Sequence, residues 1–400
     1  IQRWQVKEVD FHIEIKCEQV NHSGERICGD VFMTERVNEE DRTIIVLSDG
    51  MGHGVKANML ATLTATMALS FTREHKEVER IAEIIMNTLP VCSERKMSYS
   101  TFTIIDIIHD EEVQILEFDN PAALILRGKN VFQPEWKCIM LSSERNAGKE
   151  IVTCSFKPQK EDRIIVCSDG ITQSGLGSAK YPFGWGREKM ATEVEQLIYR
   201  DPAISADTIA SRLINIAVQN DGYLPKDDTS CASVYFREPR KLMICSGPPY
   251  EQEKDMKLAD SVRNFKGKKV ICGATTADII SRELELPIED SFEFHDKELP
   301  PISYMASIDL VTEGILTLGK VSRILEKHND QTRLGKGPAD DIIRLILQTD
   351  EVHFTIGTRI NIAHQDPSLP VELEIRRTVI KRIASILKKK FLKETHIQYI

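Results

Sequence analysis

Residues 42–54 of this 400-residue chain read Arg42-Thr-Ile-Ile-Val-Leu-Ser-Asp-Gly-Met-Gly-His-Gly54. The apolar run 44–47 predicts a buried strand, and the tripeptide Ser-Asp-Gly places the carboxylate of Asp49 at its end. Glycines at 50, 52 and 54 allow the backbone to turn sharply and to approach a ligand closely. Residues 55–71 follow with apolar positions at helical spacing. This stretch therefore predicts a strand, a ligand-binding turn and a helix.

A second strand of the same design occurs further along the chain, where Arg163-Ile-Ile-Val-Cys-Ser-Asp-Gly-Ile171 ends in the same tripeptide. Asp49 and Asp169 thus come from equivalent places in two strands. Hard cations take oxygen ligands in proteins. We interpret the first 238 residues as built around a metal site that includes both aspartates.

The hydrophobic pattern predicts the other elements of this part of the chain. They are strands at 9–20, 26–33, 99–108, 113–118 and 122–127, and helices at 76–89, 186–198 and 205–219. Residues 226–236 are expected to form an acidic turn that enters a strand. Asp30 falls in the middle of the strand expected at 26–33, which is unusual because Gly-Asp is a poor strand former.

The pattern changes at Arg237-Glu-Pro-Arg-Lys241. Length alone favours two domains, and we place them at 1–238 and 239–400. The second has the strand–turn–helix pattern of a small α/β domain. Its expected strands are 241–246, 268–272 and 352–363, and its expected helices are 250–265, 278–286, 306–328 and 372–392.

Composition excludes several classes of protein. The net charge of −9 and the lack of a basic face argue against nucleic-acid binding; Lys388–Lys390 is interpreted as a solvated helix end. Nine cysteines without a C-x-x-C pair indicate reduced thiols and a cytoplasmic protein rather than a disulfide framework or a zinc site. With no signal peptide and no apolar run near 18 residues, neither export nor a membrane span is expected.

Four short motifs occur in order: Gly29-Asp30, Ser48-Asp-Gly-Met-Gly-His-Gly54, Ser168-Asp-Gly-Ile171 and Asp227-Asp-Thr229. Each alone is weak, because Asp-Gly is a common turn. Together they resemble the metal-dependent protein phosphatase family (PPM, or protein phosphatase 2C), and within it the bacterial branch typified by stage II sporulation protein E. The resemblance covers about residues 10–238. It implies an α/β (α+β) sandwich of two antiparallel sheets flanked by helices, and hydrolysis of phosphoserine or phosphothreonine with two Mn²⁺ or Mg²⁺ ions.

The residues support this chemistry. Two cations can acidify a bridging water and neutralise the phosphoryl oxygens, and several carboxylates must converge from different strands to hold them. Singly, each aspartate could be an ordinary surface turn residue. As a set, by the family pattern, Asp49 would bridge both ions, the Gly50 carbonyl would bind one, and Asp169 and Asp228 would complete the first. Asp30 would hold the second ion, directly or through water.

Three further residues have open roles. Asp227 adjoins Asp228 and is expected to support the ligands or face solvent. His53 lies in the glycine turn, where it is a structural or supporting residue, a ligand or a general acid. Arg26 could touch phosphate, as an early arginine does in eukaryotic members of the family. Asn120-Pro-Ala122 and Gln173 depart from the residues that relatives often carry, so substrate contacts from the 120–122 loop are in doubt.

In the second domain, Val270-Ile-Cys-Gly-Ala-Thr-Thr-Ala277 predicts a strand, a glycine turn and a helix start. Free N–H groups of a helix N-terminus attract anions, so Gly273, Thr275 and Thr276 are a candidate anion site. The simpler alternative is that Thr275 or Thr276 caps the helix. Substrate docking, regulation and homodimerisation remain open roles for this domain.

The leading hypothesis is a serine/threonine phosphatase acting on a regulatory phosphoprotein, by resemblance an anti-sigma-factor antagonist. One alternative is a catalytically weak scaffold whose C-terminal domain senses a ligand. Another is a phosphatase of a small phosphorylated metabolite, because a metal site recognises the phosphate and not the rest of the substrate.

Overall fold

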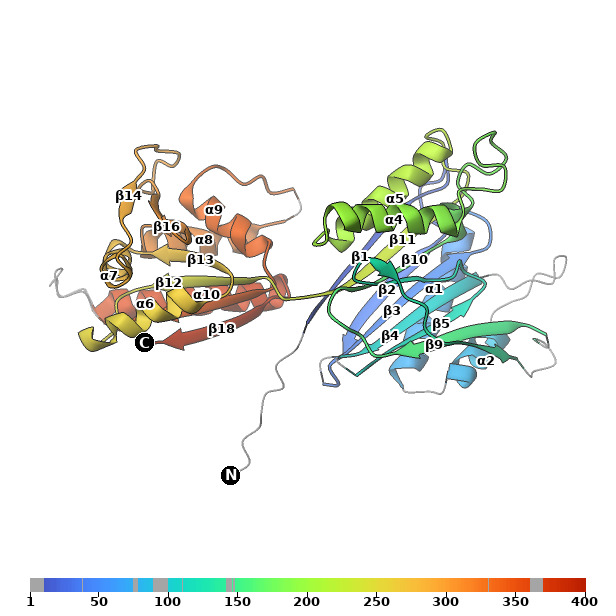
Figure 1. Cartoon of the computed structure of the whole chain (residues 1–400), viewed down its shortest axis with the longest axis horizontal. Helices are drawn as coiled ribbons and strands as arrows, with labels where there is room; N and C mark the ends of the chain where they lie inside the picture. The colour runs from blue at the N-terminus through green and yellow to red at the C-terminus, as the bar shows by residue number, and fades with distance from the viewer. Residues whose placement is uncertain are drawn as a thin grey trace, which may run out of the picture. The chain divides into compact units, whose positions relative to one another are not determined.

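The structure is a computed structural model that describes residues 11–37, 39–74, 78–88, 100–109, 111–141, 146, 148–329, 331–359 and 370–400. The chain falls into two compact units, Ile1–Glu238 and Pro239–Ile400. Figure 1 labels helices and strands of each unit. Each unit has its own sheets and its own hydrophobic clusters.

The first unit contains two antiparallel sheets packed face to face. In one the strand order is β1-β11-β10-β6-β7 and in the other β2-β3-β4-β5-β9-β8. The first comprises β1 (His12–Val20), β11 (Thr229–Arg237), β10 (Asp162–Cys167), β6 (Leu124–Arg127) and β7 (Asn130–Val131). The second comprises β2 (Val31–Val37), β3 (Arg42–Gly50), β4 (Ser100–Ile108), β5 (Glu112–Phe118), β9 (Glu150–Phe156) and β8 (Trp136–Met140).

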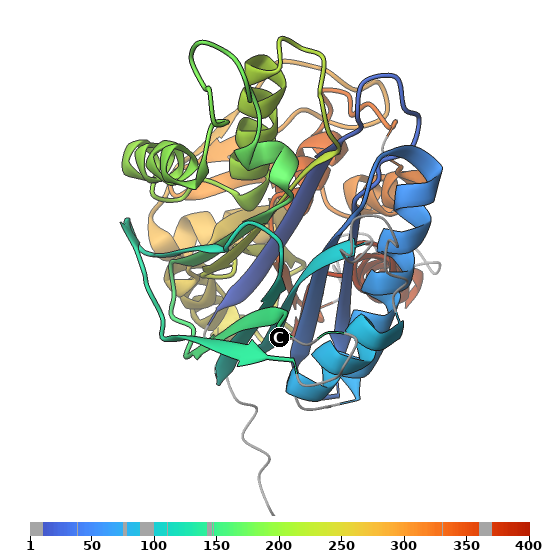
Figure 2. The ribbon, with the colours of Figure 1, turned by 90° about the vertical axis from the view of Figure 1, so that its right-hand side faces the viewer.

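Three apolar layers hold this unit together. The middle layer joins the two sheets through residues such as Leu47, Ile105 and Val234. Helices α1 (Gly54–Arg73) and α2 (Val78–Thr88) cover the sheet that contains β3, and α4 (Arg187–Arg200) and α5 (Ala206–Asn220) cover the other. Figure 2 shows the strands between these two helical layers. The expected sandwich of two antiparallel sheets flanked by helices is confirmed.

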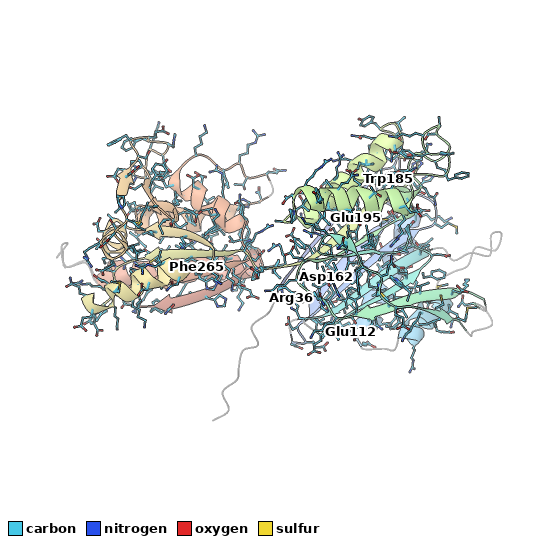
Figure 3. The ribbon with its side chains drawn as sticks, viewed as in Figure 1. Arg36, Glu112, Asp162, Trp185, Glu195 and Phe265 are labelled. Atoms are coloured by element: carbon cyan, nitrogen blue, oxygen red, sulfur yellow. The ribbon has the colours of Figure 1, made fainter. Side chains whose placement is uncertain are left out.

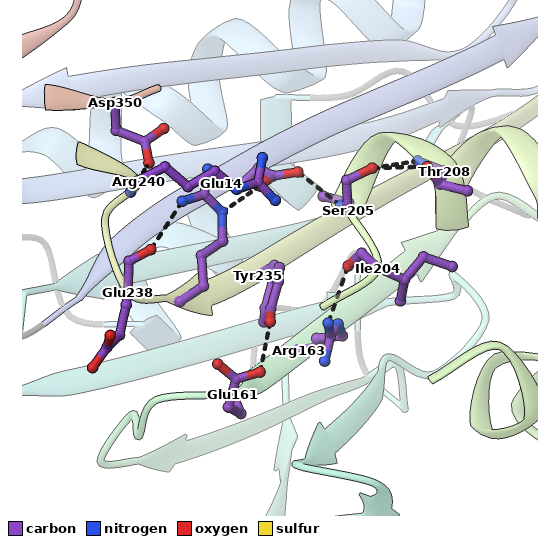
Figure 4. A network of polar contacts seen from close by, with 12 residues as sticks. Glu14, Glu161, Arg163, Ile204, Ser205, Thr208, Tyr235, Glu238, Arg240 and Asp350 are labelled. Atoms are coloured by element: carbon purple, nitrogen blue, oxygen red, sulfur yellow. Dashed lines mark hydrogen bonds and ion pairs between the residues drawn. The ribbon is translucent and has the colours of Figure 1, made fainter. Parts of the chain in front are cut away.

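A buried arginine fixes β10 and β11 to the loop that precedes α5. The Arg163 guanidinium lies 3.6 Å over the Tyr235 ring, and its Nη2 donates to the carbonyls of Pro202 and Ile204, each at 3.0 Å. The Tyr235 hydroxyl donates to Glu161 at 2.6 Å (Figure 4). These contacts explain how a fully buried cation is accommodated in a strand that carries a site aspartate at its end.

The second unit is a mostly parallel sheet with strand order β14-β15-β16-β13-β12-β17-β18. Its strands are β12 (Lys241–Ser246), β13 (Lys268–Cys272), β14 (Ile288–Asp290), β15 (Ser303–Met305), β16 (Ile308–Thr312), β17 (Glu351–Ile356) and β18 (Glu394–Tyr399). Its helices are η1 (Gln252–Lys254), α6 (Asp255–Asn264), α7 (Ala274–Leu284), α8 (Ile315–Lys327), α9 (Pro338–Leu347) and α10 (Pro370–Lys390).

Helices cover both faces of this sheet. Helices α6 and α7 pack on one face, and α8, α9 and α10 pack on the other. From β12 the chain winds outward through β13 to β16 and then returns to β17 on the other side of β12. This is the winding of a doubly wound α/β sheet.

Several expected elements lie elsewhere in the structure, and several observed elements were not predicted. The strand expected at 26–33 is wrong, because β2 begins at Val31 and Asp30 lies in the loop before it. The helix expected at 306–328 is instead β16 followed by α8. Of the turn expected at 273–277, residues 274–277 already belong to α7. Strands β8, β9 and β18 and helix α9 were not expected. Residues 9–10, 76–77, 89, 99 and 360–363 of the predicted elements lie outside the described residues.

Candidate metal centre

Strand ends from both sheets of the first unit bring the aspartates together. Asp49 lies near the end of β3, and Asp169 opens the short helix α3 (Asp169–Thr172) directly after β10. Asp30 immediately precedes β2, whose Val31 pairs with Ser48. Asp227 and Asp228 immediately precede β11, the neighbour of β10. The carboxylates thus come from two strands of each sheet.

One serine hydroxyl links the two sheets at this point. Ser230 Oγ donates to Asp30 Oδ2 at 2.6 Å, and the Ser230 N–H donates to Ser168 Oγ at 2.9 Å. In the other sheet, Ser48 Oγ lies 2.7 Å from Ser100 Oγ. Sequence reasoning missed Ser230. The signal that could have found it is the alternation in β11, where Ser230 follows the acidic turn by two residues.

The carboxyl groups strongly perturb one another. Burial raises the pKa of Asp49 to about 10, and the charges of Asp30, Asp169 and Asp227 add to the shift. Burial likewise raises the pKa of Asp30 to about 6, where a hydrogen bond from Ser230 opposes the shift. Burial also raises the pKa of Asp169. So much buried negative charge is unfavourable unless protons or cations neutralise it.

The two adjacent aspartates face different neighbours. Burial and the charge of Asp169 raise the pKa of Asp227 to about 7, and Asp227 also acts on Asp49. Asp228 instead accepts a hydrogen bond from the His22 N–H at 2.9 Å and lies beside Asp30. The sequence-based assignment expected Asp228 to join Asp169. In the structure, Asp227 is the electrostatic neighbour of Asp169.

The residues fit divalent cations. Asp30 Oδ1 and Asp228 Oδ2 are buried and have no hydrogen-bond donor among the described residues. In this described part of the chain, no three of the aspartates bring ligand oxygens within 4.8 Å of one another. Oxygen-only ligands of this kind suit Mg²⁺ and Mn²⁺.

Close backbone packing surrounds the cluster. A Cβ at Gly50 would lie 2.1 Å from the Ala57 carbonyl oxygen, and one at Gly170 would lie 2.3 Å from the Asp228 carbonyl oxygen. A Cβ at Gly29 would lie 2.6 Å from Asp228 Oδ2. The glycines beside the aspartates are thus needed for close approach. Gly50 is buried at the predicted position, and the role of its carbonyl stays a prediction.

The other predicted residues lie around the cluster. His53 is half exposed; its Nδ1 lies 2.8 Å from Glu25 Oε1, and its ring stacks on that of His22 at 4.4 Å. Arg26 is exposed in the loop between β1 and β2, which also carries His22 and Glu25. Gln173, which was noted only as a departure from relatives, donates to Asp169 Oδ2 at 2.8 Å.

The loop at residues 120–122 serves the fold in the described structure. Asn120 Nδ2 donates to the Leu47 carbonyl at 3.3 Å and to Thr103 Oγ1 at 3.1 Å. These bonds tie the loop to β3 and β4. Although Asn120 differs from the residue that relatives often carry, its side chain anchors this loop beside β3, the strand that bears Asp49.

At the candidate anion site of the second unit, the two threonines do not cap the helix and have different surroundings. Gly273, with φ of 117°, is the N-cap of α7, so capping by Thr275 or Thr276 is wrong. Thr276 is buried, and its Oγ1 accepts from the Gly247 N–H at 2.8 Å. Thr275 is exposed. The Thr276 hydroxyl therefore joins the turns that follow β12 and β13, and anion binding at Gly273 and Thr275 stays a prediction.

A two-sheet antiparallel sandwich with an aspartate cluster between the strand ends defines the first unit as a phosphoprotein phosphatase of the PPM class. Residues 39–237 match the family described as Stage II sporulation protein E (SpoIIE). The match includes all the predicted aspartates except Asp30. The first unit belongs to this family.

Three bacterial chains are among the solved structures to which this chain is similar. The phosphatase domain of SpoIIE from Bacillus subtilis has 15% identity and a TM-score of 0.43, over 57% of this chain and 93% of that one. The RsbU and RsbW domains of Rv1364c from Mycobacterium tuberculosis have 17% identity and a TM-score of 0.44, over 63% of this chain and 67% of that one. The serine/threonine phosphatase of S. agalactiae has 16% identity and a TM-score of 0.38, over 56% of this chain and 99% of that one. No curated protein matches the sequence.

Proposed function

We propose that the first unit hydrolyses phosphoserine or phosphothreonine on a regulatory protein with the aid of two Mn²⁺ or Mg²⁺ ions. The observation that carries the proposal is the convergence of five aspartates from both sheets. Burial raises the pKa of four of them, Asp30, Asp49, Asp169 and Asp227. Asp30 and Asp228 each have a buried oxygen that lacks a donor among the described residues. When bound, two such ions would supply an acidified bridging water and neutralise the phosphoryl oxygens.

The chain's own residues would divide the work. Asp49 contacts carboxylates on both sides of the cluster and is the proposed bridge between the ions. Asp169 and Asp227 are proposed to hold one ion, and Asp30 the other. This revises the sequence-based assignment, in which Asp228 completed the first ion. We now propose that Asp228, held by the His22 N–H, orients Asp30 and its ion.

The substrate proposed is the phosphoprotein that the family resemblance implies, an anti-sigma-factor antagonist, in the cytoplasm. The RsbU and RsbW domains named among the similar structures are the reason to begin with regulatory proteins. Within the residues that the structure describes, none of the helices has both the length and the apolarity needed to span a bilayer.

The test is hydrolysis of p-nitrophenyl phosphate with Mn²⁺, then with EDTA, by wild type and Asp49→Asn. Loss of a bridging carboxylate should lower turnover at least about 10²-fold, as loss of one electrostatic stabiliser does. The matched control is Asp41→Asn at the opposite end of β3, where φ of 47° suits asparagine. Its turnover should equal that of wild type.

The outcome also separates the alternatives. Asp49→Asn with more than half of wild-type turnover would remove Asp49 from the site. A wild-type protein without Mn²⁺-dependent turnover would favour the scaffold hypothesis. For an active enzyme, a phosphoserine peptide and a set of small phosphorylated metabolites should then be compared by kcat/KM, and preference for a metabolite would contradict the proposed substrate.

A further inference from the structure

Three metal-binding side chains gather on the second unit, outside the aspartate cluster. Glu351 and His353 belong to β17, and His396 belongs to the neighbouring strand β18. One ligand atom from each lies within 4.8 Å of the other two, and among the described residues this is the set of three such side chains that meets this limit.

The strand geometry explains why these side chains meet. Residues two apart in a strand share a face, so Glu351 and His353 point the same way. His353 pairs directly with His396 in the parallel register, and paired positions of adjacent strands lie side by side. Their rings stack with centroids 4.6 Å apart at 19°. Val352 and Phe354 point to the opposite face, into an apolar cluster.

The surroundings fix one histidine and leave the other accessible. Phe265, labelled in Figure 3, meets the His353 ring edge-on at 5.3 Å and 66°. The side chains of Glu351 and His353 are only 15% and 26% exposed, while His396 is exposed on the outermost strand. Glu351 and His353 are therefore partly buried, whereas His396 is open to solvent.

We propose that Glu351, His353 and His396 bind a divalent transition-metal ion, with Zn²⁺ as the best match. Two imidazole nitrogens and one carboxylate oxygen are donors that Zn²⁺ accepts, and three protein ligands leave one position open. Mg²⁺ and Ca²⁺ prefer oxygen ligands alone. The second unit would therefore select a different metal from the aspartate cluster of the first.

One ligand–ligand distance is close to that of a zinc shell. Glu351 Oε2 and His353 Nε2 are 3.0 Å apart, and two ligands of tetrahedral Zn²⁺ lie roughly 3.4 Å apart, given bond lengths near 2.1 Å. Metal entry would therefore require small shifts of these side chains and a rotation of the exposed His396. Burial lowers the pKa of His353, which favours the neutral ring that coordinates metals.

Lys241 gives the proposal a distinctive consequence. Its Nζ lies 3.4 Å from Glu351 Oε2, on the paired residue of β12. The ammonium group neutralises the carboxylate without metal and would repel an incoming cation. Removing this charge should therefore strengthen metal binding. If Lys241, Glu351 and His353 served only to stabilise the fold, the same change would lower the stability of the protein without a gain in metal affinity.

The experiment uses the full chain, stripped with EDTA, desalted and supplied with excess Mg²⁺ for the aspartate cluster. Zn²⁺ is titrated by calorimetry, and Co²⁺ by its visible absorption, which reports nitrogen ligation. His396→Ala should lose at least about tenfold in Zn²⁺ affinity, because even loss of a residue that only supports a ligand costs 10–100-fold. It should also lose the Co²⁺ bands.

Two further variants complete the test. His295→Ala, which removes a half-exposed histidine ion-paired with Glu293 in the same unit, should bind Zn²⁺ as wild type does. Lys241→Gln should bind it as tightly or more tightly. Thermal melts in EDTA check that each variant is folded. Equal Zn²⁺ affinity in folded His396→Ala and wild type, or weaker binding in folded Lys241→Gln, would overturn the proposal. Neither readout depends on phosphatase activity.

Discussion

At the scale of single residues, Asp227 and Asp228 are neighbours in sequence with different surroundings. Asp227 is the electrostatic neighbour of Asp169 and Asp49, whereas Asp228 is held by the His22 N–H. We expect Asp227→Asn to lower turnover of p-nitrophenyl phosphate at least about 10²-fold, in line with loss of an electrostatic stabiliser. Asp228→Asn should cost less, because an amide oxygen can still accept from His22.

The measurement is kcat against Mn²⁺ concentration for both variants. A larger loss in Asp228→Asn would restore the sequence-based assignment. The same titration also checks the division of labour between the ions, since loss of a ligand should raise the Mn²⁺ concentration needed for half-maximal rate.

The carboxylates also make stability depend on pH. In the metal-free protein the pKa of Asp49 is raised to about 10 and that of Asp227 to about 7. The folded state then binds more protons than the unfolded state, so the free energy of unfolding falls as pH rises between about 4 and 10. We expect the Tm of EDTA-treated protein to fall from pH 6 to pH 9, and less steeply in Asp49→Asn.

Excess Mn²⁺ should counteract this loss of Tm, since an ion that binds only the folded state stabilises it. If Tm depends on pH equally in metal-free wild type and Asp49→Asn, the pKa of Asp49 is not raised in the folded protein.

The identity of most candidate site residues could be predicted from the sequence. Asp49 and Asp169 are predictable because each lies beside glycine at the end of an expected strand, and Asp30 because Gly-Asp is unusual in the middle of an expected strand. The choice within Asp227-Asp228 could not be made, because it depends on where β11 begins and thus on which side chain faces the cluster. Glu351, His353 and His396 could not be grouped at all, since the register of β17 and β18 is set by tertiary packing.

At the scale of elements, the junction of β3 and α1 is the tightest part of the site. A Cβ at Gly50 would lie 2.1 Å from the Ala57 carbonyl oxygen, so Gly50→Ala must push the helix away from the strand. We expect a loss of about 1–3 kcal/mol in the free energy of unfolding, the usual cost of overpacking, together with a large loss of turnover.

Chemical denaturation and the p-nitrophenyl phosphate assay measure these two effects. Gly319→Ala is the matched control, because a Cβ there meets no atom within 4 Å and the position is inside helix α8. It should leave both quantities level or raise stability slightly. Unchanged stability in Gly50→Ala would mean that α1 adapts without cost.

Elements were predicted well where the hydrophobic period was clear and poorly where it was not. The paired Ser-Asp-Gly strands appear as β3 and β10. Residues 306–328 look helical throughout by composition, yet Ile308–Thr312 pairs with β13. Its parallel partner is distant in sequence, and such pairing leaves little local signal.

At the scale of the whole molecule, the division into two compact units has a functional consequence. All five aspartates lie before Glu238, and the first unit has its own core between its sheets. We expect a protein truncated after Glu238 to hydrolyse p-nitrophenyl phosphate at a rate similar to the full chain. The proposed role of residues 239–400 is docking, regulation or homodimerisation.

Size-exclusion chromatography should establish that the truncated protein is monodisperse before its kinetics are compared. Action on a phosphoprotein, or a response to a ligand, should differ between the two proteins. A folded, monodisperse but inactive truncation would show that the second unit completes the site or fixes its geometry, and the turn at Gly273 would then be examined first.

Among the described strands, β1 pairs with β11 alone, and His12 lies opposite Arg237. During synthesis the first strand must therefore wait for almost the whole unit to be translated, which at about 5–20 residues per second takes tens of seconds or less. The aspartates at 227 and 228 are also made last among the cluster. A nascent or prematurely terminated chain thus lacks the complete cluster, and phosphatase activity would appear only once the sandwich has closed.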